Sequence, residues 1–468
     1  MTRADLPPGA LGDVLLRAAD PDGYQRWADQ IRHTGYCTHP IRLSGQSLTV
    51  EEATGAITSV FDTDGEPDRM LLKACGSRRA TVCRPCSEIY RIDSWQLVAA
   101  GLRGGKGIPD TVDGHPRLFV TLTAPSFGAV HSRREVAGKV QPCASRRGHC
   151  PHGVRLGCGH RHRLDDPLVG QPLCPGCFDY AGAVLWNASV GELWRRTTIA
   201  IQRQLARLAG LPVRQLASVV RVAFTRVGEY QARGLVHVHA VLRLDAAPSP
   251  AQPDTCLPPP ATFTAGLLAD AVRAAVPRVA APVPAADADT AGSVGWGAQL
   301  DVRAIPDTRD TPEGANGVAG YVAKYATKSS DGKGALDHRL RTADEIAELD
   351  VNDHLRRLVS TAWILGGRPH LAELRLRAWA HTLGFRGHWA SRSRRYSTTL
   401  KALRLARQAW HRRHVAPPDR ATVRVGQWRY HGRGHRTAGD AWLAATAGQN
   451  ARQARELARL DRHLAAAA

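Results

Sequence analysis

The sequence predicts an α+β protein built on a central antiparallel sheet with helices on one face. Two observations carry this prediction. Segments that are rich in β-branched residues or alternate in polarity are interleaved with long helical segments, and two of the strand-like segments are separated by a short turn, as in a hairpin. The expected strands are residues 117–123, 219–227, 235–244 and 298–304, and the expected helices are 178–208, 262–276 and 315–328.

The composition points to a globular protein with a polyanionic partner. The 468 residues carry 63 Lys+Arg against 42 Asp+Glu, a formal net charge of +21, and an apolar fraction of 43% is enough to build hydrophobic cores. We find no run of 18 apolar residues and no basic-then-apolar start typical of a signal peptide. We therefore expect a cytoplasmic protein that neither spans a membrane nor is exported.

Nine of the ten cysteines fall into two clusters, and without an export signal they indicate metal binding before disulfides. The alternative is a set of buried free thiols. The first cluster predicts a zinc site of four thiolates; its members are Cys37, Cys75, Cys83 and Cys86. The second cluster also contains Cys143, His152 and a Cys-Pro-Gly-Cys turn; for its zinc we expect Cys150, Cys158, Cys174 and Cys177, with His160 or His162 as substitutes.

The second cluster lies in residues 134–177, which show little apolar periodicity. Such a segment cannot bury a core of its own, so we expect a small module that is held together by metal and inserted into the central domain. The chain would then bind one or two structural zinc ions.

A strand with two histidines follows a predicted hairpin turn. His237 and His239 are two residues apart, so both project from the same face of the strand. A turn at residues 232–234 would return Glu229, on the preceding strand, to their side. Two imidazoles and a carboxylate leave open positions on a bound Mg²⁺ or Mn²⁺, although a pair of surface histidines would give the same pattern.

The expected helix 315–328 places two phenols and two ammonium groups on one face. Tyr321, Lys324, Tyr325 and Lys328 follow the i, i+3, i+4, i+7 spacing, and the two lysines are among only seven in the chain. A tyrosine beside a cation can attack phosphorus as phenolate, because the ammonium group favours the charged nucleophile. An amphipathic helix with solvated lysines is the alternative interpretation.

The remaining segments are expected to be linkers and a basic C-terminal region. Two Pro/Ala-rich stretches, 246–260 and 279–290, predict loops. Residues 337–414 are basic and mainly helical in pattern, followed by a strand at 422–430 and a helix from Ala438 to the end. Aromatic and basic residues alternate there and could stack on bases or contact phosphates; they are Trp389, Trp410, Trp428, Arg386, Arg392, Arg394 and Arg395. For at least one of the three tryptophans we expect core packing instead.

Three short motifs give the chain a family resemblance. In order, Phe119-Val-Thr-Leu-Thr123, His237-Val-His239 and Tyr321-Val-Ala-Lys-Tyr325 resemble the motifs of the HUH endonucleases, which start rolling-circle replication. Longer matches, among them Gly35 to Leu43 and Gly384 to Trp389, resemble the replication initiators of actinobacterial plasmids. The resemblance covers about four fifths of the chain.

This resemblance implies a sheet with the RRM-like topology of HUH endonucleases and a site-specific nick at a plasmid origin through a phosphotyrosine intermediate. Glu229, His237 and His239 would bind the catalytic ion, Tyr321 and Tyr325 would be nucleophiles, and Lys324 or Lys328 would assist. The three expected parts are an N-terminal zinc-bearing region (1–115), a nickase domain (116–335) and a basic DNA-binding region (336–468).

The expected partners are origin DNA, single-stranded or extruded at the nick, together with a host helicase and the replication machinery. No Gly-x-x-x-x-Gly-Lys-Ser/Thr phosphate loop occurs, so unwinding is expected to come from the host. Conjugative relaxases and tyrosine transposases share the same site chemistry and remain alternatives. A zinc-containing DNA-binding regulator without catalysis is the alternative from another class.

Overall fold

The computed structural model describes residues 6–143, 147–248, 255–287, 291–306, 317–322, 324, 338–411 and 421–467. The chain forms two compact units. One consists of Met1–Ile92 together with Lys401–Ala468, and the other is Asp93–Leu400. These boundaries do not coincide with the three parts expected from the sequence, because the two ends of the chain join in one unit.

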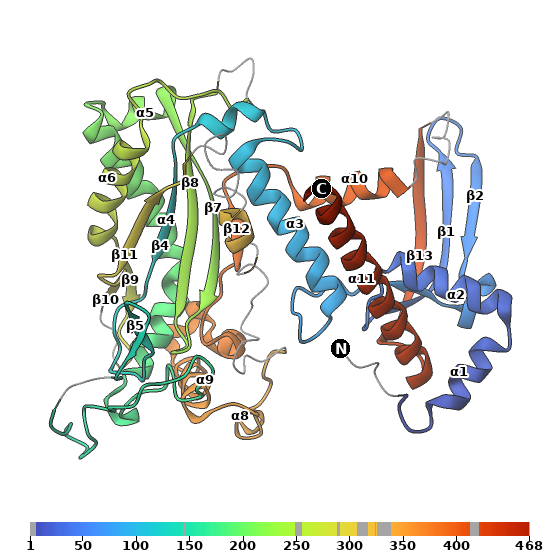
Figure 1. Cartoon of the computed structure of the whole chain (residues 1–468), viewed down its shortest axis with the longest axis horizontal. Coiled ribbons are helices and arrows are strands. Elements are labelled where there is room, and N and C mark those ends of the chain that lie inside the picture. The colour runs from blue at the N-terminus through green and yellow to red at the C-terminus, as the bar shows by residue number, and fades with distance from the viewer. Residues whose placement is uncertain are drawn as a thin grey trace. The chain divides into compact units, whose positions relative to one another are not determined.

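The larger unit is built on a five-stranded antiparallel sheet (Figure 1). Its strand order is β11-β4-β8-β7-β12. The strands are β4 (Arg117–Leu122), β7 (Val220–Tyr230), β8 (Val236–Ala246), β11 (Leu300–Ala304) and β12 (Ala390–Arg392). The four strands predicted from alternation are all present, and the short edge strand β12 lies in a segment that was expected to be helical.

Helices α4, α5 and α6 cover one face of this sheet (Figure 1). Their bounds are Tyr180–Leu208, Val213–Val219 and Ala265–Ala275. Side chains at alternate strand positions, such as Val120 and Val238, are buried against these helices. The apolar face of the sheet and the apolar faces of the helices thus form one core. The chain order β4-α4-β7-β8-α6-β11, with sheet order β11-β4-β8-β7, is the split β-α-β-β-α-β arrangement. The fold is therefore α+β with an antiparallel sheet, as predicted.

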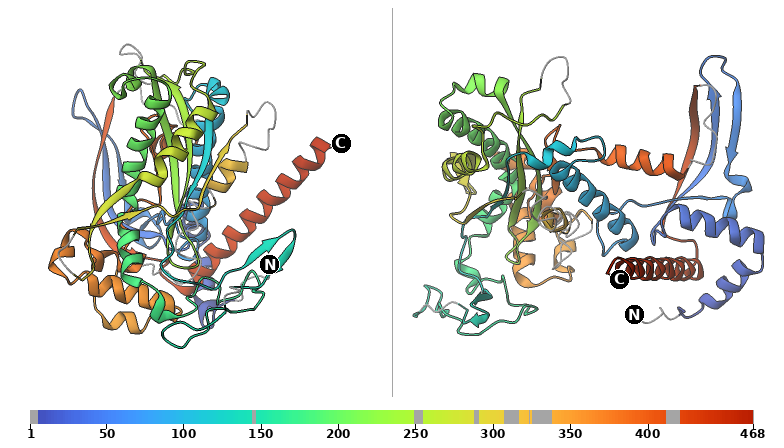
Figure 2. Two further views of the ribbon diagram at one scale, coloured as in Figure 1. Left: turned by 90° about the vertical axis from the view of Figure 1, so that its left-hand side faces the viewer. Right: turned by 45° about the horizontal axis from the view of Figure 1, so that its top comes forward.

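The long connection between β4 and α4 forms the expected insertion, which projects beyond the end of the sheet at which β4 ends (Figure 2). In its described residues it contains a small hairpin, β5 (Arg134–Val136) and β6 (Lys139–Gln141), a 3-10 turn at Pro175–Cys177 and irregular chain. One other expectation was wrong: residues 279–290 are not simply a linker, because β9 (Ala280–Pro284) pairs with β10 (Ala291–Gly295). Ala281 and Val283 bury on one side, and proline is tolerated because β9 is an edge strand.

The C-terminal part of the larger unit contains short helices. These are α8 (Asp344–Ala347), α9 (Asp353–Leu365) and two 3-10 segments, Pro369–Leu374 and Leu376–Thr382. Helix α9 packs on α4 and so joins the same core. The larger unit ends at Leu400, the first residue of α10 (Leu400–His411), and the rest of that helix belongs to the smaller unit.

The smaller unit brings the two ends of the chain together in one sheet. β1 (Ile41–Glu51) pairs along its whole length with β13 (Thr422–Arg433), and also with β2 (Ile57–Asp62) and β3 (Leu71–Lys73). The helices of this unit are α1 (Ala10–Ala18), α2 (Pro21–His33) and α11 (Ala438–Ala467). Helix α3 (Arg84–Arg103) begins here and ends in the larger unit.

A buried charge cluster lies on the sheet face opposite α4 and α6. Asp245 is fully buried and accepts hydrogen bonds from Arg243 at 2.7 and 3.0 Å, from Arg221 at 3.0 Å and from His115 at 2.8 Å. Burial alone would raise the pKa of Asp245, but the hydrogen bonds from His115 and Arg243 lower it to about 2. The carboxylate is therefore ionised and holds two guanidinium groups in place.

Replacing Asp245 with alanine should destabilise the larger unit by about 3–5 kcal/mol, because the buried Arg243 loses its carboxylate partner and its charge is left uncompensated. Urea unfolding at pH 7 measures this, with the exposed Asp270→Ala on α6 as a control that costs at most about 1 kcal/mol. Since the folded pKa lies below the unfolded value, the contribution of Asp245 should persist above about pH 4 and fall away toward pH 2. Equal losses for the two variants would contradict the prediction.

Candidate functional site

The β7–β8 hairpin and strand β4 bring the expected ligands together on one sheet face. Glu229 stands directly opposite His237, and on the other side of β8 His239 stands opposite Thr121. The turn between the strands closes at Gly234, whose φ of +74° suits glycine. The predicted return of Glu229 beside the histidines is confirmed.

The side chains point ring nitrogens and a carboxylate into a shared space. The imidazoles of His237 and His239 stack with centroids 4.7 Å apart, and His239 Nε2 lies 3.6 Å from Glu229 Oε2. That separation is longer than a hydrogen bond. Among the described residues, the buried Nε2 of His237 has no hydrogen-bond partner. Two nitrogens and one carboxylate oxygen so placed could hold one divalent cation and leave positions open.

Neighbouring polar side chains orient both histidines. Thr121 Oγ1 lies 3.2 Å from His239 Nδ1, and the Gln231 amide lies 2.9 Å from His237 Nδ1. The Thr121 hydroxyl can accept a hydrogen bond from Nδ1 of His239 and so leave Nε2 of that ring to a metal ion. The Gln231 amide N–H instead donates to Nδ1 of His237, and this contact fixes the orientation of the His237 ring. Burial, with a smaller contribution from His239, lowers the pKa of His237 to about 4, so its imidazole is neutral at pH 7.

Tyr321 lies against this site. Its ring meets His239 edge to face at 5.2 Å and Phe119 at 5.6 Å, and its side chain is half exposed. Residues 317–322 and 324 are helical, which places Lys324 almost one turn further along the same helix. Tyr325 and Lys328 lie outside the described residues. The structure thus joins the histidine strand with the first of the two predicted tyrosines.

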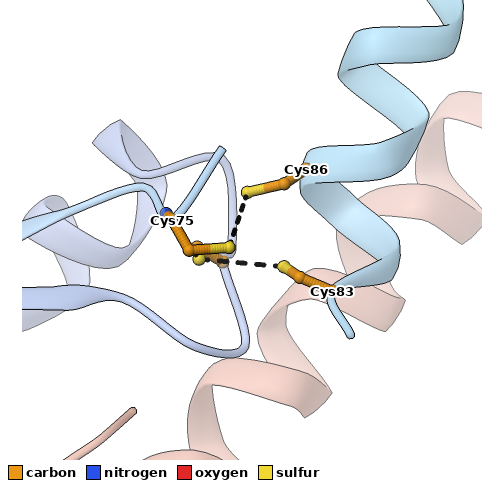
Figure 3. Close-up of side chains that lie close together, drawn as sticks. Cys75, Cys83 and Cys86 are labelled. Atoms are coloured by element: carbon orange, nitrogen blue, oxygen red, sulfur yellow. Dashed lines mark hydrogen bonds between the residues drawn. The ribbon is translucent and has the colours of Figure 1, made fainter. Parts of the chain in front are cut away.

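The four cysteines of the first cluster converge within the smaller unit. Figure 3 labels three of them, Cys75, Cys83 and Cys86. The sulfur atoms of Cys37 and Cys83 are 3.7 Å apart, and so are those of Cys75 and Cys86. Tetrahedral zinc with Zn–S bonds of about 2.3 Å would set its sulfurs about 3.8 Å apart. The hydrogen bond with Cys37 lowers the pKa of Cys83, so this thiol ionises readily. The grouping expected from the sequence is confirmed as geometry.

The candidate metal ligands of the insertion form two groups, and their membership differs from the expected one. One group consists of Cys150, His152, Cys174 and Cys177, and the other of His131, Cys143, Cys158 and His162. Cys158 therefore does not join Cys150, Cys174 and Cys177, and His152 takes its place. The cause is backbone pairing between Cys143 and residues 159–160, which carries Cys158 to Cys143. His160 belongs to neither group.

The aromatic residues expected near DNA have different environments. Trp389 packs against Tyr230 and Phe385, with ring centroids 4.8 and 4.5 Å apart, and so belongs to the core. Trp410 is 59% exposed and Trp428 41% exposed. Of the four arginines, Arg394 is exposed and Arg395 is half-buried. Arg386 donates a hydrogen bond to the Glu373 carbonyl, and burial lowers the pKa of Arg392.

Several site residues were not assigned from the sequence. Thr121 and Phe119 lie in a strand that was recognised as a motif, but only the register shows that they touch His239. Gln231 is a turn residue with no sequence signal for its contact with His237. His131 lies outside the expected 134–177 insertion, so neither periodicity nor spacing marked it as a ligand.

Comparisons with known proteins agree on one class. A family model described as "RepSA: Replication initiator protein, pSAM2" matches residues 23–449. A replication initiator protein of Streptomyces ambofaciens is 46% identical over 469 residues, covering 97% of this chain and 96% of the relative. No solved structure matches the chain. Within the described residues, no helix combines the length and hydropathy needed to cross a membrane.

Proposed function

The chain belongs to the RepSA family of actinobacterial plasmid replication initiators, and on that basis we propose that it nicks one DNA strand at its origin through a tyrosine of the site on β4, β7 and β8. The observation that carries this proposal is the meeting of Tyr321 with His239, beside His237 and Glu229. The split β-α-β-β-α-β arrangement supports the HUH-endonuclease topology.

The ligand set fits a hard divalent ion at a phosphate. Glu229, His237 and His239 would hold Mg²⁺ or Mn²⁺, which would polarise the scissile phosphate. The unpartnered Nε2 of His237 and the gap between His239 and Glu229 are the two features that favour a cation here over a simple hydrogen-bonded pair. Phe119 stacks on His239 at 5.8 Å and limits where that ring can turn.

The reaction is a transesterification. The hydroxyl oxygen of Tyr321 loses its proton and attacks phosphorus, the bond to the 3′ oxygen breaks, and that oxygen takes up a proton. The product is a 5′-phosphotyrosine, which keeps the energy of the phosphodiester, so the 3′-hydroxyl can attack in turn and rejoin the strand without ATP. Lys324 would favour the phenolate. Tyr325 would cut the new junction while the first end remains attached.

The test uses supercoiled plasmid that carries the chain's own origin, with Mn²⁺, and a denaturing gel. We expect nicked circles with protein covalently attached, and no nicking of a plasmid that differs only in lacking the origin. Binding without cleavage would overturn the proposal in favour of a non-catalytic regulator. Cleavage that requires a transfer origin or a transposon end would indicate a relaxase or a transposase.

Thr121 should position His239 for the ion. Thr121→Val keeps the shape of the side chain but removes the hydroxyl that lies 3.2 Å from Nδ1. We expect the affinity for Mn²⁺ to fall about 10- to 100-fold, and the nicking activity to recover at high Mn²⁺ concentration. Titration of nicking against Mn²⁺ measures this, and Thr361→Val, on the exposed side of α9, is the control. An unchanged Mn²⁺ requirement would rule out the positioning role.

One face of the sheet in the smaller unit is suited to single-stranded DNA. Arg424, Trp428 and Tyr430 alternate along β13 and so share a face. Tyr430 is 60% exposed, and the Trp428 ring lies 6.1 Å from that of Phe61. Aromatic faces beside arginine stack on bases of any sequence. With the net charge of +21, this face supports origin DNA as the partner, with unwinding left to a host helicase.

Zinc would hold the two cysteine groups that contain three or four thiols. These are Cys37, Cys75, Cys83 and Cys86 in the smaller unit, and Cys150, His152, Cys174 and Cys177 in the insertion. Cys83→Ser should lower the zinc content by one ion per chain and expose the smaller unit to proteolysis, because the metal supplies folding free energy. Cys256→Ser is the control, since Cys256 is buried but belongs to none of the groups. An unchanged zinc content in Cys83→Ser would end this assignment.

A further inference from the structure

We propose that the insertion between β4 and α4 binds a second structural metal ion, a zinc held by His131, Cys143, Cys158 and His162. The insertion would then be a two-ion module, and the whole chain would carry three structural ions. The four residues are distinct from Glu229, His237 and His239, so the case for this metal site does not depend on the proposed nickase chemistry.

The distances within the group match a tetrahedral ion. His131 Nδ1 lies 3.2 Å from His162 Nε2, His162 Nε2 lies 3.5 Å from Cys158 Sγ, and His131 Nδ1 lies 4.0 Å from Cys143 Sγ. A zinc with bonds of about 2.0–2.1 Å to nitrogen and 2.3 Å to sulfur would give edges of about 3.3 Å between nitrogens and 3.6 Å between nitrogen and sulfur. All four ligand atoms lie within 4.8 Å of one another.

The surroundings prepare these atoms to act as ligands. His162 is buried, and its Nδ1 lies 2.7 Å from the carboxylate of Asp166, which also accepts the Leu168 backbone N–H. That carboxylate keeps the proton on Nδ1 and leaves the Nε2 lone pair directed at the group, as carboxylates do for zinc-bound histidines. The backbone N–H of Ser132 lies 3.2 Å from Cys143 Sγ, where it would stabilise a thiolate.

The insertion has little else to hold it in shape. In its described residues between 132 and 171, no valine or leucine is buried, and Leu164 is 84% exposed. Its backbone pairs instead tie the ligands together: Cys143 bonds with residues 159 and 160, and residues 129–131 bond with 170–173, just before Cys174. Two ions in one frame would replace a hydrophobic core that this segment lacks.

The insertion also touches the hairpin that carries Glu229 and His237. The Arg233 guanidinium donates at 3.0 Å to the carbonyls of Ala124 and Pro125, where the insertion starts, and to Gln231, the neighbour of His237. Gly170 lies so close to the hairpin that a Cβ there would approach the Ala232 carbonyl carbon to 2.4 Å. An effect of this metal on nicking rests on the proposed function, whereas the metal site itself does not.

The test is a metal count on the full-length chain, by native mass spectrometry and elemental analysis. We expect three zinc ions per chain in the wild type, two in Cys143→Ser/Cys158→Ser, and three in the control Cys256→Ser. An equal zinc count in the wild type and the double variant would overturn the proposal. That result would mean that His131 and His162 form only a hydrogen-bonded pair.

Asp166→Asn keeps the proposal testable if the double variant does not fold. It should retain the fold but release one of the three zinc ions to a competing chelator at about 10- to 100-fold lower chelator concentration. Unchanged release of all three ions would contradict the site. A wild-type chain with three zinc ions that fails to nick origin DNA would count against the proposed function and leave this metal site standing.

Discussion

Replacing His237 and His239 together with alanine should lower Mn²⁺-dependent nicking of origin plasmid by on the order of a thousandfold, equivalent to about 4 kcal/mol of barrier. The two imidazoles supply both nitrogen donors of the site, and Glu229 alone is a weak ligand for a divalent ion in water. Each single replacement should lower the nicking rate by less than the double replacement. The loss should be larger for His239, because Thr121 and Phe119 fix its ring.

The measurement needs a separate reading of DNA binding. Binding of origin duplex at low salt without metal should stay within about twofold of wild type, because phosphate contacts by arginine supply most of the affinity. His370→Ala, a half-buried histidine of the same unit that bonds to the Ala285 carbonyl, is the control for loss of an imidazole. Equal loss of binding and cleavage would show that His237 and His239 are structural.

The local part of this site could be predicted from sequence because it depends on short-range geometry. A strand repeats every two residues, so His237 and His239 must share a face, and a tight turn must return Glu229 to them. Helical spacing likewise placed Tyr321 and Lys324 on one face. These conclusions need no knowledge of what packs beyond the hairpin and the helix.

Pairings between distant segments were not predictable in the same way. β1 pairs along its whole length with β13, nearly 400 residues later in the chain. Nothing in the sequence of either strand indicates that the two pair. The sorting of the insertion's ligands failed for a related reason: Cys158 and Cys150 have equal chemistry, and only the backbone pairing of Cys143 with His160 decides which group Cys158 joins. Spacing predicts that thiols bind metal but not which thiols share one ion.

Proline-rich composition misled for a more local reason. β9 contains Pro282 and Pro284, which argue against a central strand, but an edge strand can leave those positions unbonded. Ala281 and Val283 alternate with the prolines, and this period-2 pattern is typical of a strand despite the Pro/Ala-rich composition. Trp389 was one of three tryptophans considered for base stacking, with core packing expected for at least one of them, and its ring packs on Tyr230 and Phe385.

Tyr321→Phe should reduce the covalent link between protein and nicked DNA by at least a hundredfold, since in the proposed reaction the phenol oxygen is the attacking group. The phenyl ring keeps the edge-to-face contacts with His239 and Phe119, so the fold and the metal site should be unchanged. Tyr24→Phe, on α2 of the smaller unit, is the matched control and should form the adduct at the wild-type rate.

The measured quantity is radiolabelled DNA that migrates with the protein after denaturation, followed by identification of the labelled peptide. Tyr325→Phe, tested in parallel, should still form the first adduct but fail to transfer the strand, because the second nucleophile acts only after the first. If the labelled peptide of the wild type carries DNA on Tyr325 alone and Tyr321→Phe nicks normally, the roles are reversed. In that case the contact between Tyr321 and His239 serves packing, and the order of the two cleavages follows from Tyr325 instead.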